Sequence, residues 1–168
     1  LMILGLDLSL RETGYYVSDS VYGVLKPPKG QDKGVARLAW FYRQIRALIR
    51  ENNITNCALE GYAFSRGATG MVFNIGEQGG IIRLILFSMK VRTVIVPATT
   101  LKQFVTGKGN SKKDQMMLSI YKRWGKDFSN DNVADAYALH QFGSIYFAEP
   151  DSALTEKEKI LKTKVTEL

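Results

Sequence analysis

The sequence of 168 residues has one cysteine, one histidine and four prolines, and no long uninterrupted apolar run. Because Cys57 has no second cysteine to pair with, an intrachain disulfide is excluded, which suits a reducing, cytoplasmic setting. The apolar stretches are broken by Asp7, by Gly79-Gly80, by Arg83 and by Lys90, so we expect no membrane span. The apolar N-terminus lacks a cationic leader and is expected to form a strand, not a signal peptide.

Repeats, linkers and nucleophile motifs are missing as well. Without an internal repeat or a dividing linker, we expect one domain over residues 1–150 and a charged tail, mobile or docked, over residues 151–168. No serine, tyrosine or cysteine stands in a nucleophile motif, which argues against a covalent enzyme intermediate. The one histidine, His140, is interpreted as structural or surface-exposed.

Positive charge is present in excess. The net charge is +7, with 45% apolar and 23% charged residues, as in a globular protein whose partner is a polyanion. Lysines and arginines concentrate between residues 102 and 126, where Asp114 is the one acid. A basic segment of this kind favours salt-sensitive binding of nucleic-acid phosphates, although a solvated helix face has the same pattern. Its members are Lys102, Lys108, Lys112, Lys113, Lys122, Arg123 and Lys126.

Hydrophobic periodicity and breaker residues predict an α/β fold. The strands are expected at residues 2–8, 14–18, 21–25, 55–60 and 92–97. Helices are expected at residues 35–52, 70–89, 112–124 (capped by Ser111) and 131–147, with a short helix or turn at 99–105. This order predicts a mixed five-stranded sheet, a three-strand antiparallel meander followed by parallel strands, flanked by helices.

The expected helix 70–89 contains Gly76, Gly79 and Gly80, which are unfavourable in a helix interior. Two interpretations remain open. The glycines allow close approach of another helix, such as one from a dimer mate, or they allow tight packing within the monomer.

Four acidic residues stand where a metal-dependent nuclease would need them. Asp7 lies inside an apolar strand, Glu60 ends another, and Asp131 and Asp135 share one helix face. Buried carboxylates are costly unless a cation compensates them, and hard oxygen ligands suit Mg²⁺ or Mn²⁺. Two such ions would activate water and stabilise the leaving oxygen of a phosphodiester, with Asp7 as the bridging ligand.

Each acid also has a structural interpretation. Asp7 could cap a turn, and Glu60 could face solvent at a strand end. Asp131 or Asn132 could be the N-cap of the last helix, with Asp135 favoured by the helix dipole. The joint pattern of the four acids favours the metal site.

The ordered motifs resemble the RuvC-type Holliday junction resolvases of the ribonuclease H-like superfamily, in particular their short phage versions. The resemblance runs from Met2 to about Phe147. It depends on Gly5-Leu6-Asp7-Leu8-Ser9, on Ala134-Asp135-Ala136, and on segments 13–14, 59–64, 74–80, 96–103 and 107–115.

The resemblance implies a ribonuclease H-like fold and a homodimer that cuts four-way DNA junctions by paired symmetric nicks. It implies Mg²⁺, replaceable by Mn²⁺, with about two ions per site. Asp7, Glu60 and Asp135 match the family's metal ligands directly. The family's remaining acid falls on Asn132, whereas the charged residue is Asp131, one position earlier; we favour Asp131.

For DNA binding, the resemblance implies that Lys102 and Lys113 contact the scissile backbone, with Lys113 part of the catalytic set. Lys108 and Lys112 belong to the general basic patch. Phe64 and then Tyr62 are candidates to stack on junction bases, or to fill the core beneath their loop. Arg66 is expected to assist with phosphate.

Three other functions remain open at this stage. The first is a nuclease of the same superfamily with broader branched-DNA or flap specificity, and the second is a non-catalytic DNA-binding dimer. The third is an actin-like ATPase, which the segment from Gly5 to Gly14 also resembles, but the chain is too short for the two domains that class requires. No small-molecule cofactor and no membrane partner are expected.

Overall fold

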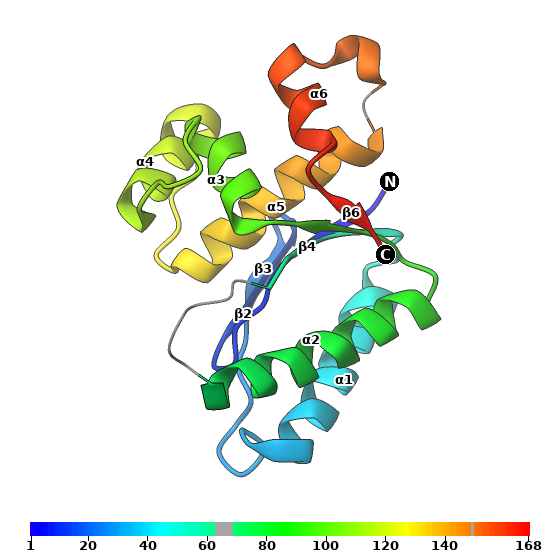
Figure 1. Ribbon diagram of the computed structural model, residues 1–168. Coiled ribbons are helices and arrows are strands. Elements are labelled where there is room, and N and C mark those ends of the chain that lie inside the picture. The colour runs from blue at the N-terminus through cyan, green and yellow to red at the C-terminus, as the bar shows by residue number, and fades with distance from the viewer. Residues whose placement is uncertain (63–68, 149) are drawn as a thin grey trace.

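A six-stranded mixed sheet forms the centre of the molecule, with helices on both faces (Figure 1). The computed structural model describes residues 1–62, 69–148 and 150–168. The strands are β1 (Ile3–Asp7), β2 (Thr13–Ser18), β3 (Val21–Leu25), β4 (Asn56–Glu60), β5 (Arg92–Val96) and β6 (Thr166–Glu167). Their order across the sheet is β3-β2-β1-β4-β5-β6.

The strand directions agree with the expected meander and parallel extension. β1, β2 and β3 are antiparallel neighbours, and β4 and β5 run parallel to β1. The expectation of five strands was wrong by one, because β6 pairs with β5 in the antiparallel sense. Leu6 of β1 is level with Leu59 of β4. The next residues, Asp7 and Glu60, therefore end the two strands side by side and point to the same face.

The helices divide between the two faces of the sheet (Figure 1). On one face lie α1 (Gly34–Glu51) and α2 (Thr69–Ser88), and on the other lie α3 (Ala98–Thr106), α4 (Lys113–Trp124) and α5 (Asp131–Ala148). Four of these helices were predicted, with bounds that differ by a few residues, and the segment that forms α3 was predicted as a short helix or turn. No helix in the described ranges has the length and apolar character needed to cross a membrane.

Two glycines bring α5 into direct contact with the sheet. A Cβ on Gly5 of β1 would collide with the carbonyl oxygen of Ala136, and a Cβ on Gly14 of β2 would collide with the carbonyl of Asn132. The backbone of α5 therefore lies against β1 and β2 more closely than any side chain would permit. This close approach fixes the start of α5, with its acidic residues, over the ends of the strands.

The glycines of α2 do not share one role. Gly79 is buried against Tyr62, whose ring would overlap a Cβ at that position. Gly76 and Gly80 are exposed, and no atom of the described residues lies within 4 Å of the place a Cβ would take. Packing within the monomer therefore explains Gly79 and leaves Gly76 and Gly80 on an open face.

The buried face of α1 is not wholly apolar. Phe41, Ile45 and Ile49 are buried, whereas Tyr42 is exposed. One turn before Phe41, the buried position is taken by Arg37. The first buried position of this helix is therefore occupied by a cation.

The charged tail folds back onto the domain. It contains a short 3₁₀ turn, η1 (Asp151–Ala153), then α6 (Glu156–Lys162) and β6. Leu161 of α6 is buried in the same cluster as Phe104 of α3, and Glu158 pairs with Arg123 of α4 at 3.6 Å. Of the two expectations for residues 151–168, docking agrees with this arrangement.

Candidate active site

Two carboxyl groups meet where β1 and β4 end. The Asp7 side chain is 6% exposed and hydrogen-bonds to the Glu60 carboxylate. Burial raises the pKa of Asp7 well above its ordinary value, and the hydrogen bond and the negative charge of Glu60 act in the same direction. Burial also raises the pKa of Glu60. The two carboxyl groups therefore resist simultaneous ionisation, and the shift is larger for the more buried Asp7.

The first turns of α5 add two further carboxylates. Burial, followed by the charges of Asp7 and Asp131, raises the pKa of Asp135 to about 7. Asp131 lies one turn earlier and forms an ion pair with Lys113 of α4, which lowers the pKa of Asp131. The charge of Asp131 nevertheless raises the pKa of both Asp7 and Asp135. All four acids therefore influence one another, as a shared site requires.

A cavity of about 220 Å³ opens beside these acids. Three of the acids and two lysines line it, together with apolar side chains from α3 and α4: Glu60, Ala98, Lys102, Lys113, Met116, Met117, Asp131 and Asp135. Lys102 and Lys113 both lower the pKa of Asp135, so the cavity combines buried carboxylates with cations at one edge. The structure therefore brings the acids close to Lys102 and Lys113, the two lysines that were predicted to contact the scissile DNA backbone.

The carboxylate oxygens of the four acids suit a divalent cation, but the side chains are not arranged as a complete coordination shell. Within residues 1–62, 69–148 and 150–168, no three His, Cys, Asp or Glu side chains are placed so that they could hold a metal ion together. Asp7 and Glu60 bond to each other, and Asp131 bonds to Lys113. Hard carboxylate oxygens whose ionisation is resisted by burial and like charge form a set that a cation would stabilise.

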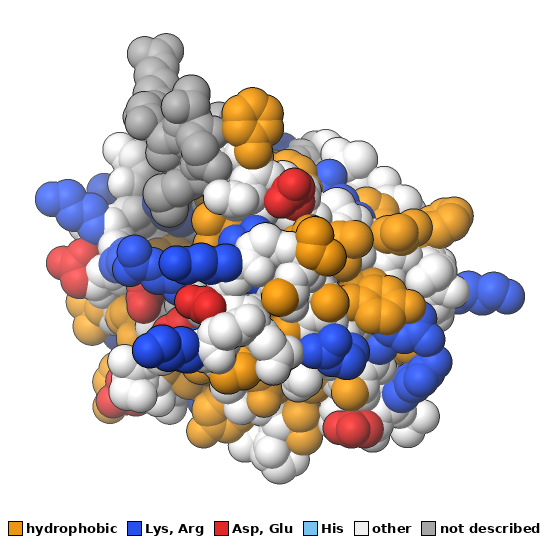
Figure 2. All heavy atoms as spheres, turned by 90° about the horizontal axis from the view of Figure 1, so that it is seen from below, with side chains coloured by type: hydrophobic (Ala, Val, Ile, Leu, Met, Phe, Trp, Pro, Cys, Tyr) orange, Lys and Arg blue, Asp and Glu red, His pale blue; other side chains and the backbone are white. Residues whose placement is uncertain are grey.

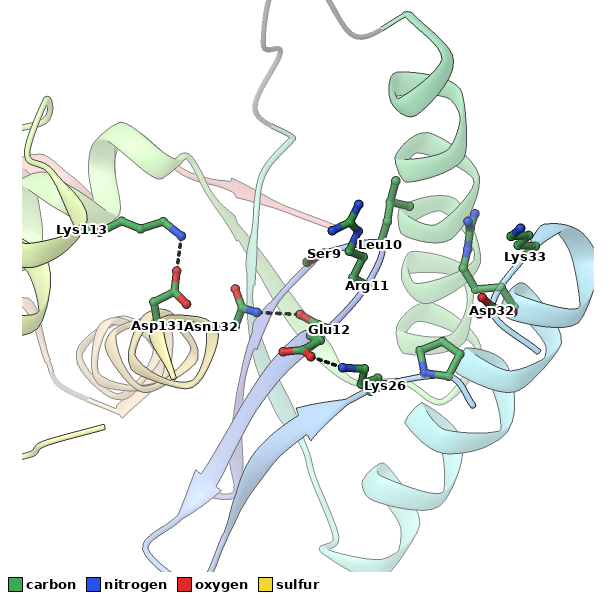
Figure 3. Close-up of a pocket in the computed structure, with 12 residues that line it drawn as sticks. Ser9, Leu10, Arg11, Glu12, Lys26, Asp32, Lys33, Lys113, Asp131 and Asn132 are labelled. Carbon is green, nitrogen blue, oxygen red and sulfur yellow. Dashed lines mark hydrogen bonds and ion pairs between the residues drawn. The ribbon is translucent and has the colours of Figure 1, made fainter. Parts of the chain in front are cut away.

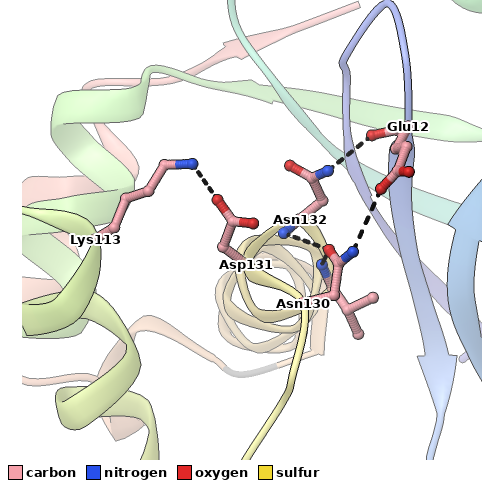
Figure 4. A network of polar contacts seen from close by, with 6 residues as sticks. Glu12, Lys113, Asn130, Asp131 and Asn132 are labelled. Atoms are coloured by element: carbon pink, nitrogen blue, oxygen red, sulfur yellow. Dashed lines mark hydrogen bonds and ion pairs between the residues drawn. The ribbon is translucent and has the colours of Figure 1, made fainter.

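The residue that caps α5 is neither of the two expected. The Asn130 side-chain oxygen accepts from the backbone N–H of Asn132 at 2.9 Å and of Val133 at 3.4 Å. The Asn132 amide donates to the carbonyl of Glu12 at 3.0 Å, whereas Asp131 points toward Lys113 (Figure 4). The interpretation of Asp131 or Asn132 as the N-cap was therefore wrong, and Asp131 is left available to the acidic site.

The family model of the crossover junction endodeoxyribonuclease RuvC matches residues 3–141. The chain belongs to the RuvC family. A RuvC from Brachyspira hyodysenteriae is 28% identical over 132 residues, which is 79% of this chain and 80% of that relative. A RuvC from Prochlorococcus marinus is 27% identical over 150 residues, covering 83% and 95% of the two chains.

The RuvC fold is also found among solved structures. Thermus thermophilus RuvC in complex with a Holliday junction substrate superimposes with a TM-score of 0.69 at 18% identity, covering 83% of this chain and 91% of that one. At such identity the likeness concerns the fold alone. The ribonuclease H-like architecture predicted from the sequence is confirmed.

The fourth acid of this RuvC-family site can be identified by two substitutions. We expect Asp131→Asn to lower DNA cleavage by roughly 10²-fold or more, since it removes a charged oxygen ligand. Asn132→Ala should cost less than tenfold, because it removes a hydrogen bond to the Glu12 carbonyl and no charge. Single-turnover cleavage rates measure both. A larger loss with Asn132→Ala would reverse the assignment.

The lysines of the α3–α4 loop lie apart from the cavity. Lys108 and Lys112 are exposed and do not line it. Ser111 does not cap α4, contrary to expectation, because its hydroxyl bonds to Thr106 at 2.6 Å and to the carbonyl of Lys108 at 2.9 Å. These bonds close the loop that presents the two lysines, whose role in DNA binding stays a prediction.

Three residues after β4 were predicted to contact DNA, and the structure describes one of them, Tyr62. Phe64 and Arg66 lie outside the described residues. The Tyr62 hydroxyl donates to the carbonyl of Gly76 at 3.3 Å, and the Arg83 guanidinium lies 4.3 Å from the centre of its ring. This placement corresponds to the packing alternative for Tyr62, and stacking on DNA remains a prediction.

A second cavity was not anticipated from the sequence. It has a volume of about 750 Å³ and adjoins the acidic site, with Lys113 and Asp131 on one side and Lys33 on the other (Figure 3). Among its lining residues are Arg37 and the ion pair of Lys26 with Glu12 at 2.6 Å. The available signal was the fourfold spacing that places Arg37 in line with Phe41 and the other buried residues of α1.

Proposed function

We propose that this RuvC-family chain is a Mg²⁺-dependent endonuclease that resolves four-way DNA junctions by paired symmetric nicks made by a homodimer. The observation that carries the proposal is the gathering of Glu60, Asp131 and Asp135 around one cavity edged by Lys102 and Lys113, with Asp7 hydrogen-bonded to Glu60. The names of the relatives agree with this activity.

Divalent ions would be held by the four acids and, when bound, would activate a water molecule and stabilise the leaving oxygen. The protein contributes rigidity at the positions of these acids. Strands fix Asp7 and Glu60, and the glycine contacts of α5 fix Asp131 and Asp135 above them. Metal binding would displace the proton from Asp7, so affinity for the ion should increase with pH.

The two lysines position the scissile strand. Lys113 is exposed and reaches across the cavity to Asp131, and Lys102 is half-buried on α3. Both can contact phosphate oxygens beside the acids, while their positive charge offsets the repulsion between the carboxylates and the DNA. Lys113 would exchange Asp131 for a phosphate once ions neutralise that acid.

The exposed face of α2 supports a dimer. Phe73, Leu84 and Phe87 are 76%, 60% and 71% exposed, and together with Gly76 and Gly80 they follow one side of the helix. Figure 2 views the molecule from the side of α1 and α2, and hydrophobic side chains cover much of that face. A stripe of large apolar residues with two exposed glycines between them can pack against the same stripe of a second copy of the chain.

We expect Leu84→Glu to weaken self-association by about 100-fold, because two unpaired carboxylates would be buried in each dimer. Sedimentation equilibrium measures the dissociation constant. Leu118→Glu is the matched control, since Leu118 is 52% exposed on α4, away from the stripe. Equal effects of the two substitutions would contradict an interface on α2.

The nicking pattern tests the activity itself. End-labelled four-way junctions incubated with the protein and Mg²⁺ should yield two nicks at symmetric positions on denaturing gels. Flap and plain duplex substrates should be cut at least about tenfold more slowly. Equal cutting of flaps would favour a broader branched-DNA nuclease, and tight binding without any cutting would favour a non-catalytic DNA-binding protein.

A further inference from the structure

The second cavity is continuous with the acidic site. Both are lined by Lys113 and Asp131, so a ligand that passes the carboxylates can extend into the larger space. Its remaining walls come from the β1–β2 loop, from the segment after β3 and from the start of α1 (Figure 3). The volume of this space, about 750 Å³, is more than three times the 220 Å³ of the cavity beside the acids.

Arg37 is the unusual member of this lining. Its side chain is only 5% exposed, and its Nε–H has no hydrogen-bond partner among the described residues. The one bond of its guanidinium that the structure defines goes to the backbone carbonyl of Asn74, at 3.3 Å. No acid in the described ranges forms an ion pair with Arg37. A buried cation with an unpaired donor is unfavourable, and an anion in the adjoining cavity would compensate both the charge and the donor.

The charged side chains that line the cavity have a net positive charge, which would attract an anion. Five cations, Arg11, Lys26, Lys33, Arg37 and Lys113, face three acids, Glu12, Asp32 and Asp131. Each acid already has a donor: Glu12 has Lys26 at 2.6 Å, Asp131 has Lys113, and Asp32 accepts from the Gly30 amide at 3.1 Å.

The start of α1 adds to the positive potential. The N-cap residue Lys33 makes no side-chain capping hydrogen bond, and the first turn contains no acidic residue. Neither of these positions therefore compensates the partial positive charge of the helix N-terminus, which lies beside Lys33 and in the same turn as Arg37.

We propose that Arg37 binds a backbone phosphate of the DNA strand, displaced from the scissile phosphate, where the strand leaves the acidic site through this cavity. The inference rests on the proposed function, because it takes the ligand of the neighbouring site to be DNA. The guanidinium offers a fixed planar set of donors that suits phosphate oxygens, and its bond to Asn74 holds it in place. Arg37 is thus a positioning residue that sets the register of the strand.

The Nε–H of Arg37 gives a direct readout in the wild-type protein. Its NMR resonance, assigned by its loss in Arg37→Lys, should shift on titration with a single-stranded pentanucleotide, and at higher concentration with inorganic phosphate. Sodium chloride of equal ionic strength should leave it unchanged. A shift with inorganic phosphate alone would indicate a general anion site and overturn the DNA assignment, as would no shift at all.

Binding of an intact junction tests the same residue independently of cleavage. In EDTA, Arg37→Gln should reduce the slope of log affinity against log salt by about 0.9, the change expected for one phosphate contact. Arg50→Gln removes the same charge at the exposed far end of α1 and should leave the slope unchanged. Equal slopes for Arg37→Gln and the wild type would refute the inference.

The two proposals fail in different ways. If the protein cuts junctions but neither the Arg37 resonance nor the salt slope responds, only the phosphate site is wrong. If both respond but no branched DNA is cut, the phosphate site stands and the endonuclease proposal is wrong. Should Arg37→Gln unfold, the wild-type titration and the charge-conserving Arg37→Lys variant still decide the question.

Discussion

Replacing Asp7 with asparagine is expected to abolish junction cleavage while leaving the junction bound. The substitution keeps the shape and the hydrogen bond to Glu60 but removes the most buried acid of the site. If the ions supply several kcal/mol of transition-state stabilisation, the single-turnover rate should fall by about 10³-fold or more. Affinity for the junction should stay equal or increase, since one negative charge near the DNA is lost. Cleavage within tenfold of wild type would contradict a role for Asp7.

The same variant should be more stable than the wild type at neutral pH. Because the pKa of Asp7 is raised in the folded state, the folded protein keeps a proton that the unfolded chain releases. Stability therefore decreases as pH rises from the unfolded pKa toward the folded one. Asparagine is neutral throughout, so its advantage should appear at pH 8 and vanish below about pH 4.

Thermal unfolding in EDTA at pH 4, 6 and 8 measures this difference. Each kcal/mol gained should raise the melting temperature by roughly 2–4 °C for a chain of this size. Asp127→Asn makes the same charge change at an exposed position on the α4–α5 loop. This control should alter neither the cleavage rate nor the pH dependence of the melting temperature. A lower melting temperature for Asp7→Asn at pH 8 would contradict the proposed cost of burying this carboxylate.

Most of the fold could be predicted because its signals are local. The strands β1 and β4 are short apolar runs, and the antiparallel strands β2 and β3 follow β1 directly, with Gly14 and Gly23 inside them. The sixth strand could not be predicted, since Thr166–Glu167 has no apolar pattern of its own. It forms where the tail returns to the free edge of β5, and this depends on the docking of α6 through Leu161.

The acidic site was predicted from a joint pattern, and its details depend on tertiary contacts. The sequence placed Asp7 and Glu60 at strand ends, and the parallel register explains why they lie level. It could not show that Asn130 caps α5, because four consecutive residues there, 129–132, are all good capping types. The fourfold spacing from Phe41 was the signal for Arg37, but an arginine on an amphipathic helix is expected to be exposed, so its burial was not predicted.

Replacing Gly5 with alanine is expected to destabilise the protein by about 3 kcal/mol or more, a large part of the stability of an ordinary domain. The new Cβ would collide with the carbonyl oxygen of Ala136 and lie 2.6 Å from the amide nitrogen of His140. Both contacts are backbone atoms of α5, so no side-chain rotation can relieve them, and the helix must move away from β1. Urea unfolding, followed by circular dichroism, measures the loss.

The displacement of α5 should also reduce cleavage in molecules that remain folded, because Asp131 and Asp135 would move away from Asp7. Gly80→Ala is the control, since the same methyl group meets no atom within 4 Å in the part of the chain that the structure describes. At concentrations where the chain is monomeric, Gly80→Ala should stabilise the protein by about 0.5–1 kcal/mol, as alanine generally does within a helix. If Gly5→Ala cost as little as 1 kcal/mol and left cleavage intact, the contact between α5 and β1 would not be what holds the two halves of the acidic site together.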